Sequence, residues 1–164
     1  MLGSTEDGAR IAAALGVGFA FAHHINPDSA GHATQVYRRI FKASPGLDRP
    51  RVILALSAIC ADSSEAAEEL ASSLELGWMR LRSGKPSPLP SPTEALNYQY
   101  NDSERQLAQA TRAHFTAGTP QEVKARLLAL ADLCQADEIM IMTMAHSHAA
   151  RIRSYELLAQ SFQL

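Results

Sequence analysis

The sequence has few aromatic residues, almost no net charge and no long apolar run. Aromatics make up 6% of the 164 residues, and 15 basic residues against 17 acidic ones give a formal charge of −2. Such a balance is not typical of nucleic-acid-binding proteins, whose affinity comes from neutralising phosphates. No stretch of about 18 apolar residues is present, so no transmembrane helix is expected. A charged segment followed by an apolar one is also missing, so no secretion signal is expected.

Cysteine is scarce as well, since the chain has only Cys60 and Cys134. Both lie inside apolar runs, which predicts buried, reduced thiols rather than a disulfide. Together with the composition, this favours a cytoplasmic protein. The length suffices for one globular domain. The start, Leu2-Gly3-Ser4-Thr5, reads as though the chain began inside an element.

What is present is an alternation of apolar runs and helical stripes. Residues 17–25, 51–60 and 139–144 are continuous apolar runs that predict buried strands, with a strand remnant before Ser4. Amphipathic helices are expected between them, with starts at Ser4-Thr5, Asn26-Pro27, Ser63, Thr119-Pro120 and Ser147. Alternating strands and helices predict right-handed βαβ units and a parallel sheet, an α/β fold.

One segment interrupts this alternation. Residues 84–93 contain proline at every second position from Pro86 to Pro92, which excludes a helix and favours an extended path. Because neither flank resembles a separate domain, we interpret the segment as a loop or lid within a single domain, 1–164. Residues 93–115 are polar and permit a helix.

Several stretches resemble the bacterial luciferase-like flavin monooxygenases, a family of (β/α)8 TIM barrels. The matching stretches are Leu2-Gly3-Ser4-Thr5, residues 18–24, 51–62 and 118–123, Asp137-Glu138-Ile139-Met140, and residues 148–158. No single stretch is diagnostic, but their order and spacing cover nearly the whole chain. The resemblance implies an enzyme that uses reduced FMN and O2 to oxidise a small organic substrate.

The resemblance further implies that the chain corresponds to the C-terminal half of such a barrel. A whole barrel needs about 250 residues, whereas about four parallel strands with outer helices are expected here. Half a barrel leaves sheet edges and one apolar sheet face uncovered. We therefore predict a partner, either a second copy in a barrel-like homodimer or a separate N-terminal half. A shorter open sandwich is the alternative architecture.

The first candidate site is Gly3-Ser4-Thr5 with the helix that follows. Glycine allows close backbone approach, hydroxyls donate hydrogen bonds, and a helix N-terminus favours anions. The resemblance implies that this turn holds the FMN phosphate. The same residues would also serve as ordinary helix caps, and Glu6 and Asp7 would repel a phosphate brought too close.

Histidines form the second candidate site. His23 and His24 end one predicted strand and His146 follows another; in α/β barrels, active sites lie at the carboxyl ends of strands. We expect them to line a substrate pocket, with at most one of His23 and His24 facing the barrel interior. A zinc-dependent hydrolase would need further ligands, and none is clearly placed, so no metal site is predicted.

The remaining motifs are interpreted structurally. Gly118-Thr119 is expected to start a helix, the stripe containing Trp78 and Met79 to face the core, and Arg151 and Arg153 to lie on a solvated helix face. No residue is assigned a catalytic role, because the flavin carries the difficult chemistry in such enzymes. The alternative to a monooxygenase, or a truncated fragment of one, is a non-catalytic flavin-binding or assembly module.

Overall fold

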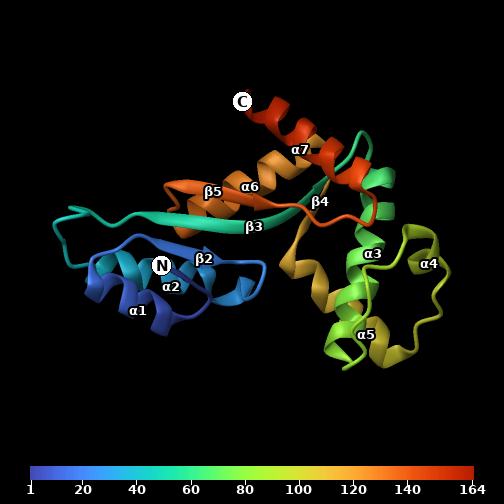
Figure 1. Cartoon of the computed structure of the whole chain (residues 1–164), viewed down its shortest axis with the longest axis horizontal. Helices are drawn as coiled ribbons and strands as arrows, with labels where there is room; N and C mark the ends of the chain where they lie inside the picture. Colours follow the sequence, from blue (N-terminus) through green and yellow to red (C-terminus); the bar gives the residue numbers. More distant parts are fainter. The chain divides into compact units, whose positions relative to one another are not determined.

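A computed structural model describes all 164 residues, which form an α/β protein with parallel strands (Figure 1). The chain divides into two compact units. The first contains residues 1–57 and 126–142, and the second contains residues 58–125 and 143–164. Strand β3 (Val52–Cys60) and helix α6 (Pro120–Cys134) contribute residues to both. None of the helices has the length and apolar character needed to cross a membrane.

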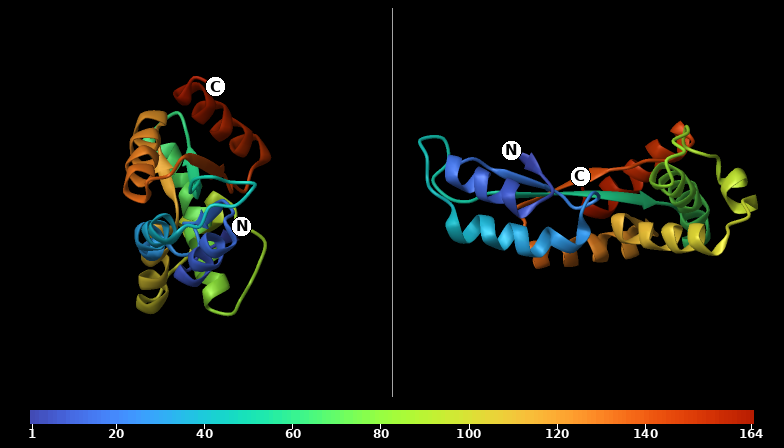
Figure 2. Two further views of the ribbon diagram at one scale, coloured as in Figure 1. Left: turned by 90° about the vertical axis from the view of Figure 1, so that its left-hand side faces the viewer. Right: turned by 90° about the horizontal axis from the view of Figure 1, so that it is seen from below.

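The first unit is built around a parallel sheet. Besides its parts of β3 and α6, it contains β1 (Leu2–Gly3), α1 (Glu6–Leu15), β2 (Phe19–Ala22), η1 (Pro27–Ser29), α2 (Ala30–Ile40) and β5 (Glu138–Met142). The strands pair in the order β1, β2, β3, β5, with Gly3 beside Phe21, Phe21 beside Leu54, and Leu54 beside Ile139. Helices α1 and α2 lie side by side (Figure 2).

The two faces of this sheet are covered differently. Phe19, Phe21 and Leu54 share one face and are fully buried, which is expected for strands packed against helices. On the opposite face, Leu2 at one edge is 68% exposed and Met140 at the other edge is 52% exposed. Strands β1 and β5 each pair on one side only. The unit therefore presents apolar side chains and unpaired strand edges to solvent.

The second unit surrounds the end of β3 with helices. It contains α3 (Ser64–Arg82), α4 (Pro92–Asn97), α5 (Asp102–Thr111), η2 (Arg112–His114), β4 (Thr116–Gly118), the start of α6, and α7 (His148–Phe162). Strand β4 pairs in parallel with Ala58–Cys60. The core joins Ile59, Leu74 and Phe115, and the hydroxyl of Ser154 on α7 accepts a hydrogen bond from the Cys60 amide at 2.9 Å.

The predicted strands at 17–25, 51–60 and 139–144 are confirmed as β2, β3 and β5, with narrower bounds for β2 and β5. Two local predictions were wrong. Strand β4 was missed because its three residues are too few to show a periodic pattern. Asn26 does not cap a helix. Pro27–Ser29 form a 3₁₀ turn without a side-chain cap, and the side-chain amide of Asn26 donates instead to the Ser4 carbonyl oxygen.

Candidate functional site

The predicted cofactor turn and two of the predicted histidines lie at the same edge of the first unit. Because Gly3 pairs with Phe21 in a parallel ladder, the residues after β1 and after β2 emerge together. The Asn26 side-chain amide joins them by donating to the Ser4 carbonyl oxygen at 3.0 Å. His24 lies with Nδ1 3.2 Å from the Ala55 carbonyl oxygen, and His23 is 7% exposed. The structure thus places the predicted turn after β1 and the two histidines after β2 at one edge, next to Ala55 of β3.

Thr5 and Ser4 play different parts at this turn. Thr5 is the N-cap of α1, since its hydroxyl accepts from the Gly8 amide at 3.2 Å and its carbonyl oxygen accepts from the Ala9 amide. The Ser4 hydroxyl makes no hydrogen bond within the chain. The amides of Glu6 and Asp7, in the first turn, also lack partners, as is usual at helix starts. An anion would meet one hydroxyl, two N–H groups and the positive helix pole.

Gly3 fits tightly against its surroundings. A Cβ at this position would lie 3.3 Å from the Phe19 ring and 3.7 Å from the Gly8 Cα. The Glu6 carboxylate accepts from the Arg10 guanidinium, at 2.8 Å from Nε, and from His32. These bonds, led by that of Arg10, lower the pKa of Glu6. Its charge is therefore paired along α1, which reduces the repulsion expected between Glu6 and a bound phosphate.

The third predicted histidine, His146, belongs to the second unit. Its Nδ1 lies 2.9 Å from the carbonyl oxygen of Leu89, in the proline-rich segment. Because a carbonyl oxygen only accepts, Nδ1 must carry the proton. His146 thus ties the segment after β5 to the proline-rich segment.

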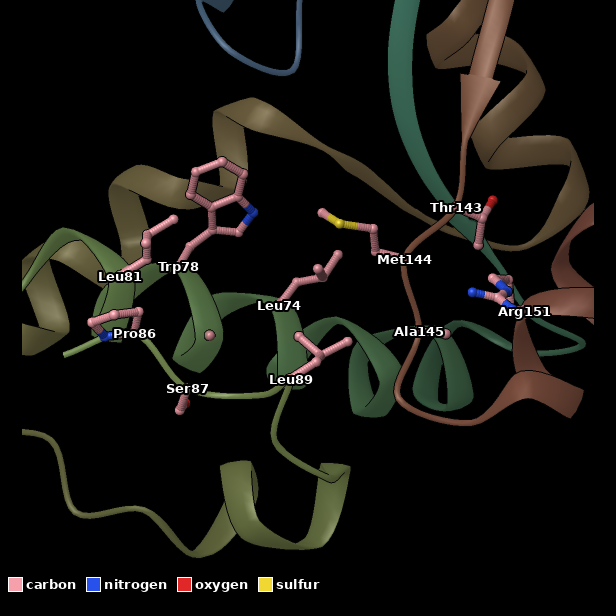
Figure 3. A pocket seen from close by; sticks show the side chains of 11 residues that line it. Leu74, Trp78, Leu81, Pro86, Ser87, Leu89, Thr143, Met144, Ala145 and Arg151 are labelled. Atoms are coloured by element: carbon pink, nitrogen blue, oxygen red, sulfur yellow. The ribbon is translucent and has the colours of Figure 1, made fainter. Parts of the chain in front are cut away.

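Next to this bond lies a cavity of about 400 Å³ that the sequence reasoning missed (Figure 3). Its wall comes from α3, the proline-rich segment, residues 143–145 after β5, and α7. The lining residues are Leu74, Gly77, Trp78, Leu81, Pro86, Ser87, Leu89, Thr143, Met144, Ala145 and Arg151. Most of these side chains are apolar, which is typical of small-molecule sites.

Trp78 packs against the core cluster of Ile59, Leu74 and Phe115, as predicted, and its ring also lines this cavity. Its ring is half-buried and stacks on His114 at 6.1 Å, and the Arg82 guanidinium lies 5.9 Å from its centroid. Met79 is 1% exposed and does belong to the core. The sequence signal for the cavity is Gly77: a Cβ there would lie 3.0 Å from Leu89, so glycine lets the proline-rich segment approach α3.

Arg151 is the only charged residue in the cavity wall, and it lies at an exposed position of α7, as the sequence predicted. Its Nη2 donates to His148 Nδ1 at 2.8 Å, and it forms no ion pair. Arg153, in contrast, pairs with Asp62 at 2.5 Å. The Thr143 hydroxyl donates to the Ala58 carbonyl oxygen, so it is already engaged.

The other predicted motifs have internal partners. The Glu122 carboxylate accepts from the amide and hydroxyl of Thr119, each at 2.8 Å, so the chain's own anion occupies the Gly118-Thr119 turn. Cys60 and Cys134 are free and buried, as predicted. No group of three or more His, Cys, Asp or Glu residues is arranged to hold a metal ion.

Comparison with known proteins decides the family. A model described as luciferase-like monooxygenase matches residues 1–136. The chain belongs to this family. The resemblance inferred from the sequence is thereby confirmed, and so is the α/β fold with a parallel sheet.

Relatives of this family member are about twice as long. A luciferase-like monooxygenase of Escherichia coli (strain K12) is 34% identical over 157 residues, which cover 96% of this chain and 47% of that protein. The chain spans about half the length of the curated relatives it matches, which is consistent with half of a barrel.

Solved structures agree with the assignment. The crystal structure of apo-MsnO8 superposes with a TM-score of 0.90 at 30% identity, covering 99% of this chain and 50% of that one. The oxygenating constituent of 3,6-diketocamphane monooxygenase from Pseudomonas putida, solved in complex with FMN, shares the fold at 14% identity, with a TM-score of 0.57 over 98% of this chain and 46% of that one.

Proposed function

We propose that this chain is part of an FMN-dependent monooxygenase that uses reduced flavin and O2 to oxidise a small organic substrate. The proposal rests on family membership and on one observation, the turn at Gly3-Ser4-Thr5. There the Ser4 hydroxyl and the first amides of α1 remain available beside His23 and His24. The FMN complex of 3,6-diketocamphane monooxygenase supports the choice of cofactor.

In this proposal the Ser4 hydroxyl and the amides of Glu6 and Asp7 bind the FMN phosphate, while Gly3 lets the strand end pack closely. Thr5 keeps the helix start rigid through its bond with Gly8. Bound reduced flavin would supply the electrons that activate oxygen. His23 and His24 border this site. The cavity beside Trp78 takes the organic substrate, and His146 supports its wall through Leu89.

Substitutions at Ser4 test this assignment. Ser4→Asp adds a negative charge at a helix start, which stabilises a helix by about 0.3–1 kcal/mol but repels a phosphate. We expect the variant to melt no lower than the wild type and to lose the thermal stabilisation that FMN gives the wild type. Ser103→Asp, on an exposed site in α5, is the control. Equal FMN stabilisation in all three proteins would refute the phosphate site.

The open sheet face of the first unit supports a partner. Leu2 and Met140 are exposed at its two edges, and both edge strands have unpaired sides. In the proposal, a second copy or a separately encoded half covers this face and completes the barrel in the cytoplasm. Light scattering at micromolar concentration tests the first option, since a mass of one chain would exclude a homodimer.

The non-catalytic flavin-binding or assembly module remains the second candidate. Oxygen-dependent consumption of reduced FMN in the presence of substrate separates the two. FMN binding without such consumption, in the chain and its assembled partner, would support the module.

A further inference from the structure

We propose that the cavity beside Trp78 binds an apolar organic anion, with the anionic end at Arg151. The apolar part of the wall comes from Leu74, Leu89 and Met144 around the indole of Trp78, as Figure 3 shows. Side chains of this kind favour hydrocarbon over water. The volume, about 400 Å³, lies toward the small end of ligand sites, which span about 300–1,000 Å³. The ligand is therefore small and largely hydrocarbon.

The charge of the ligand follows from the electrostatics at one end of the cavity. Arg151 lies in the first turn of α7, which contains no acidic residue. The positive helix pole and the guanidinium thus add at the same place. No carboxylate lines the cavity, and Arg151 has only the neutral acceptor His148 Nδ1 as a side-chain partner. A carboxylate or sulfonate would supply the missing counter-charge.

Two other arginines of this unit are neutralised by carboxylates, whereas Arg151, the charged residue that lines the cavity, is not. Arg153, two residues away, is neutralised by Asp62 and Glu156, and Arg112 by Glu68 and Glu75. Arg151 keeps its donors toward a mostly apolar cavity instead. That this ligand is the substrate rests on the proposed function. Binding of the ligand to the cavity itself requires no flavin.

Trp78 is the only tryptophan of the chain, so its fluorescence reports directly on this cavity. We would titrate the full chain with octanoate and with octan-1-ol, which have the same chain length but differ in charge. We expect both to change the emission saturably, with octanoate binding at least about tenfold more tightly because its carboxylate accepts a charged hydrogen bond that the alcohol cannot match. Equal affinities for the two probes would overturn the proposal.

Variants assign the preference to Arg151 and the binding to the cavity. Arg151→Met keeps the length without the charge and should reduce octanoate affinity to that of octan-1-ol, leaving the alcohol unchanged. Arg126→Gln, an exposed arginine outside the cavity, should behave as wild type. Ala145→Leu should weaken both probes by filling the cavity. Unchanged octanoate binding in Arg151→Met, or unchanged binding of both probes in Ala145→Leu, would refute the proposal. If octanoate binds as expected while FMN fails to bind, only the proposed flavin function fails.

Discussion

The imidazole of His146 donates through Nδ1 to the carbonyl oxygen of Leu89 at 2.9 Å. The two residues are 57 positions apart, and the bond joins the segment before α7 to the proline-rich segment. In that segment four prolines lack an N–H group, so few backbone donors are available to fix it. A single side-chain hydrogen bond can therefore decide how closely the segment is held over the cavity.

Removing this bond should loosen the cavity wall. We expect His146→Ala to increase acrylamide quenching of Trp78, because Leu89 and Trp78 line the same cavity. His146→Asn keeps a donor near the position of Nδ1 and should restore the wild-type quenching. His32→Ala, on the surface of the first unit, is the control. Quenching that stays at the wild-type value in His146→Ala would show that the bond does not position the segment.

A side chain at position 77 would affect both the stability of α3 and the size of the cavity. Alanine is favoured over glycine in a helix by up to about 1 kcal/mol, whereas a Cβ would approach Leu89 Cδ1 at 3.0 Å and Pro90 Cδ at 3.5 Å. The end of the Leu89 side chain can rotate away. We expect Gly77→Ala to raise the free energy of unfolding by about 0.5 kcal/mol and to weaken ligand binding in the cavity.

Urea unfolding and Trp78 titration would measure these two effects separately. Gly16→Ala is the matched contrast. Gly16 has φ +65°, and an added Cβ would lie 2.6 Å from the Lys42 carbonyl oxygen. That variant should lose at least about 1–2 kcal/mol. A Gly77→Ala protein as destabilised as Gly16→Ala would mean that Leu89 cannot move.

Much of the fold follows from local sequence patterns, whereas the cavity does not. The run at 51–60 predicts β3 because a strand buried on both faces needs apolar residues throughout. The cavity depends on the approach of Leu89 to Gly77 and on residues from α3, the proline-rich segment and α7 that come together in one wall, and no sequence periodicity predicts such contacts between elements. Trp78 shows the difference: its place on the apolar stripe was predictable, but its exposure to a cavity depends on the path of the proline-rich segment.

The Cys60 thiol should be unreactive in the folded protein. Burial, with a smaller contribution from the Asp62 charge, raises its pKa from near 9 to about 11, and burial also raises the pKa of Cys134. Folding thus favours the neutral thiols. The contribution of the Cys60 thiol to stability is complete below its unfolded pKa and is lost as pH rises from about 9 toward 11.

We therefore expect neither thiol to react with an aromatic disulfide reagent at pH 8 before the protein unfolds. Both should react at once in denaturant, which serves as the control. Rapid modification of either thiol in the folded protein would contradict the buried, neutral state.

The Glu122 carboxylate at the start of α6 should stabilise the folded protein at neutral pH but not at acid pH. Its carboxylate accepts from the Thr119 amide, the Thr119 hydroxyl and the Ser64 hydroxyl, and these bonds, led by that of the amide, lower its pKa. A lowered pKa means that the stabilisation is complete above the unfolded value, about 4.3, and is lost as pH falls through the folded value.

Glu122→Gln should therefore be less stable than the wild type at pH 7 in urea unfolding, and the difference should shrink as the pH falls below about 4. Glu69→Gln, which removes a carboxylate that accepts no hydrogen bond, is the control. A Glu122→Gln difference that stays constant down to acid pH would indicate that the loss comes from packing and not from the charge.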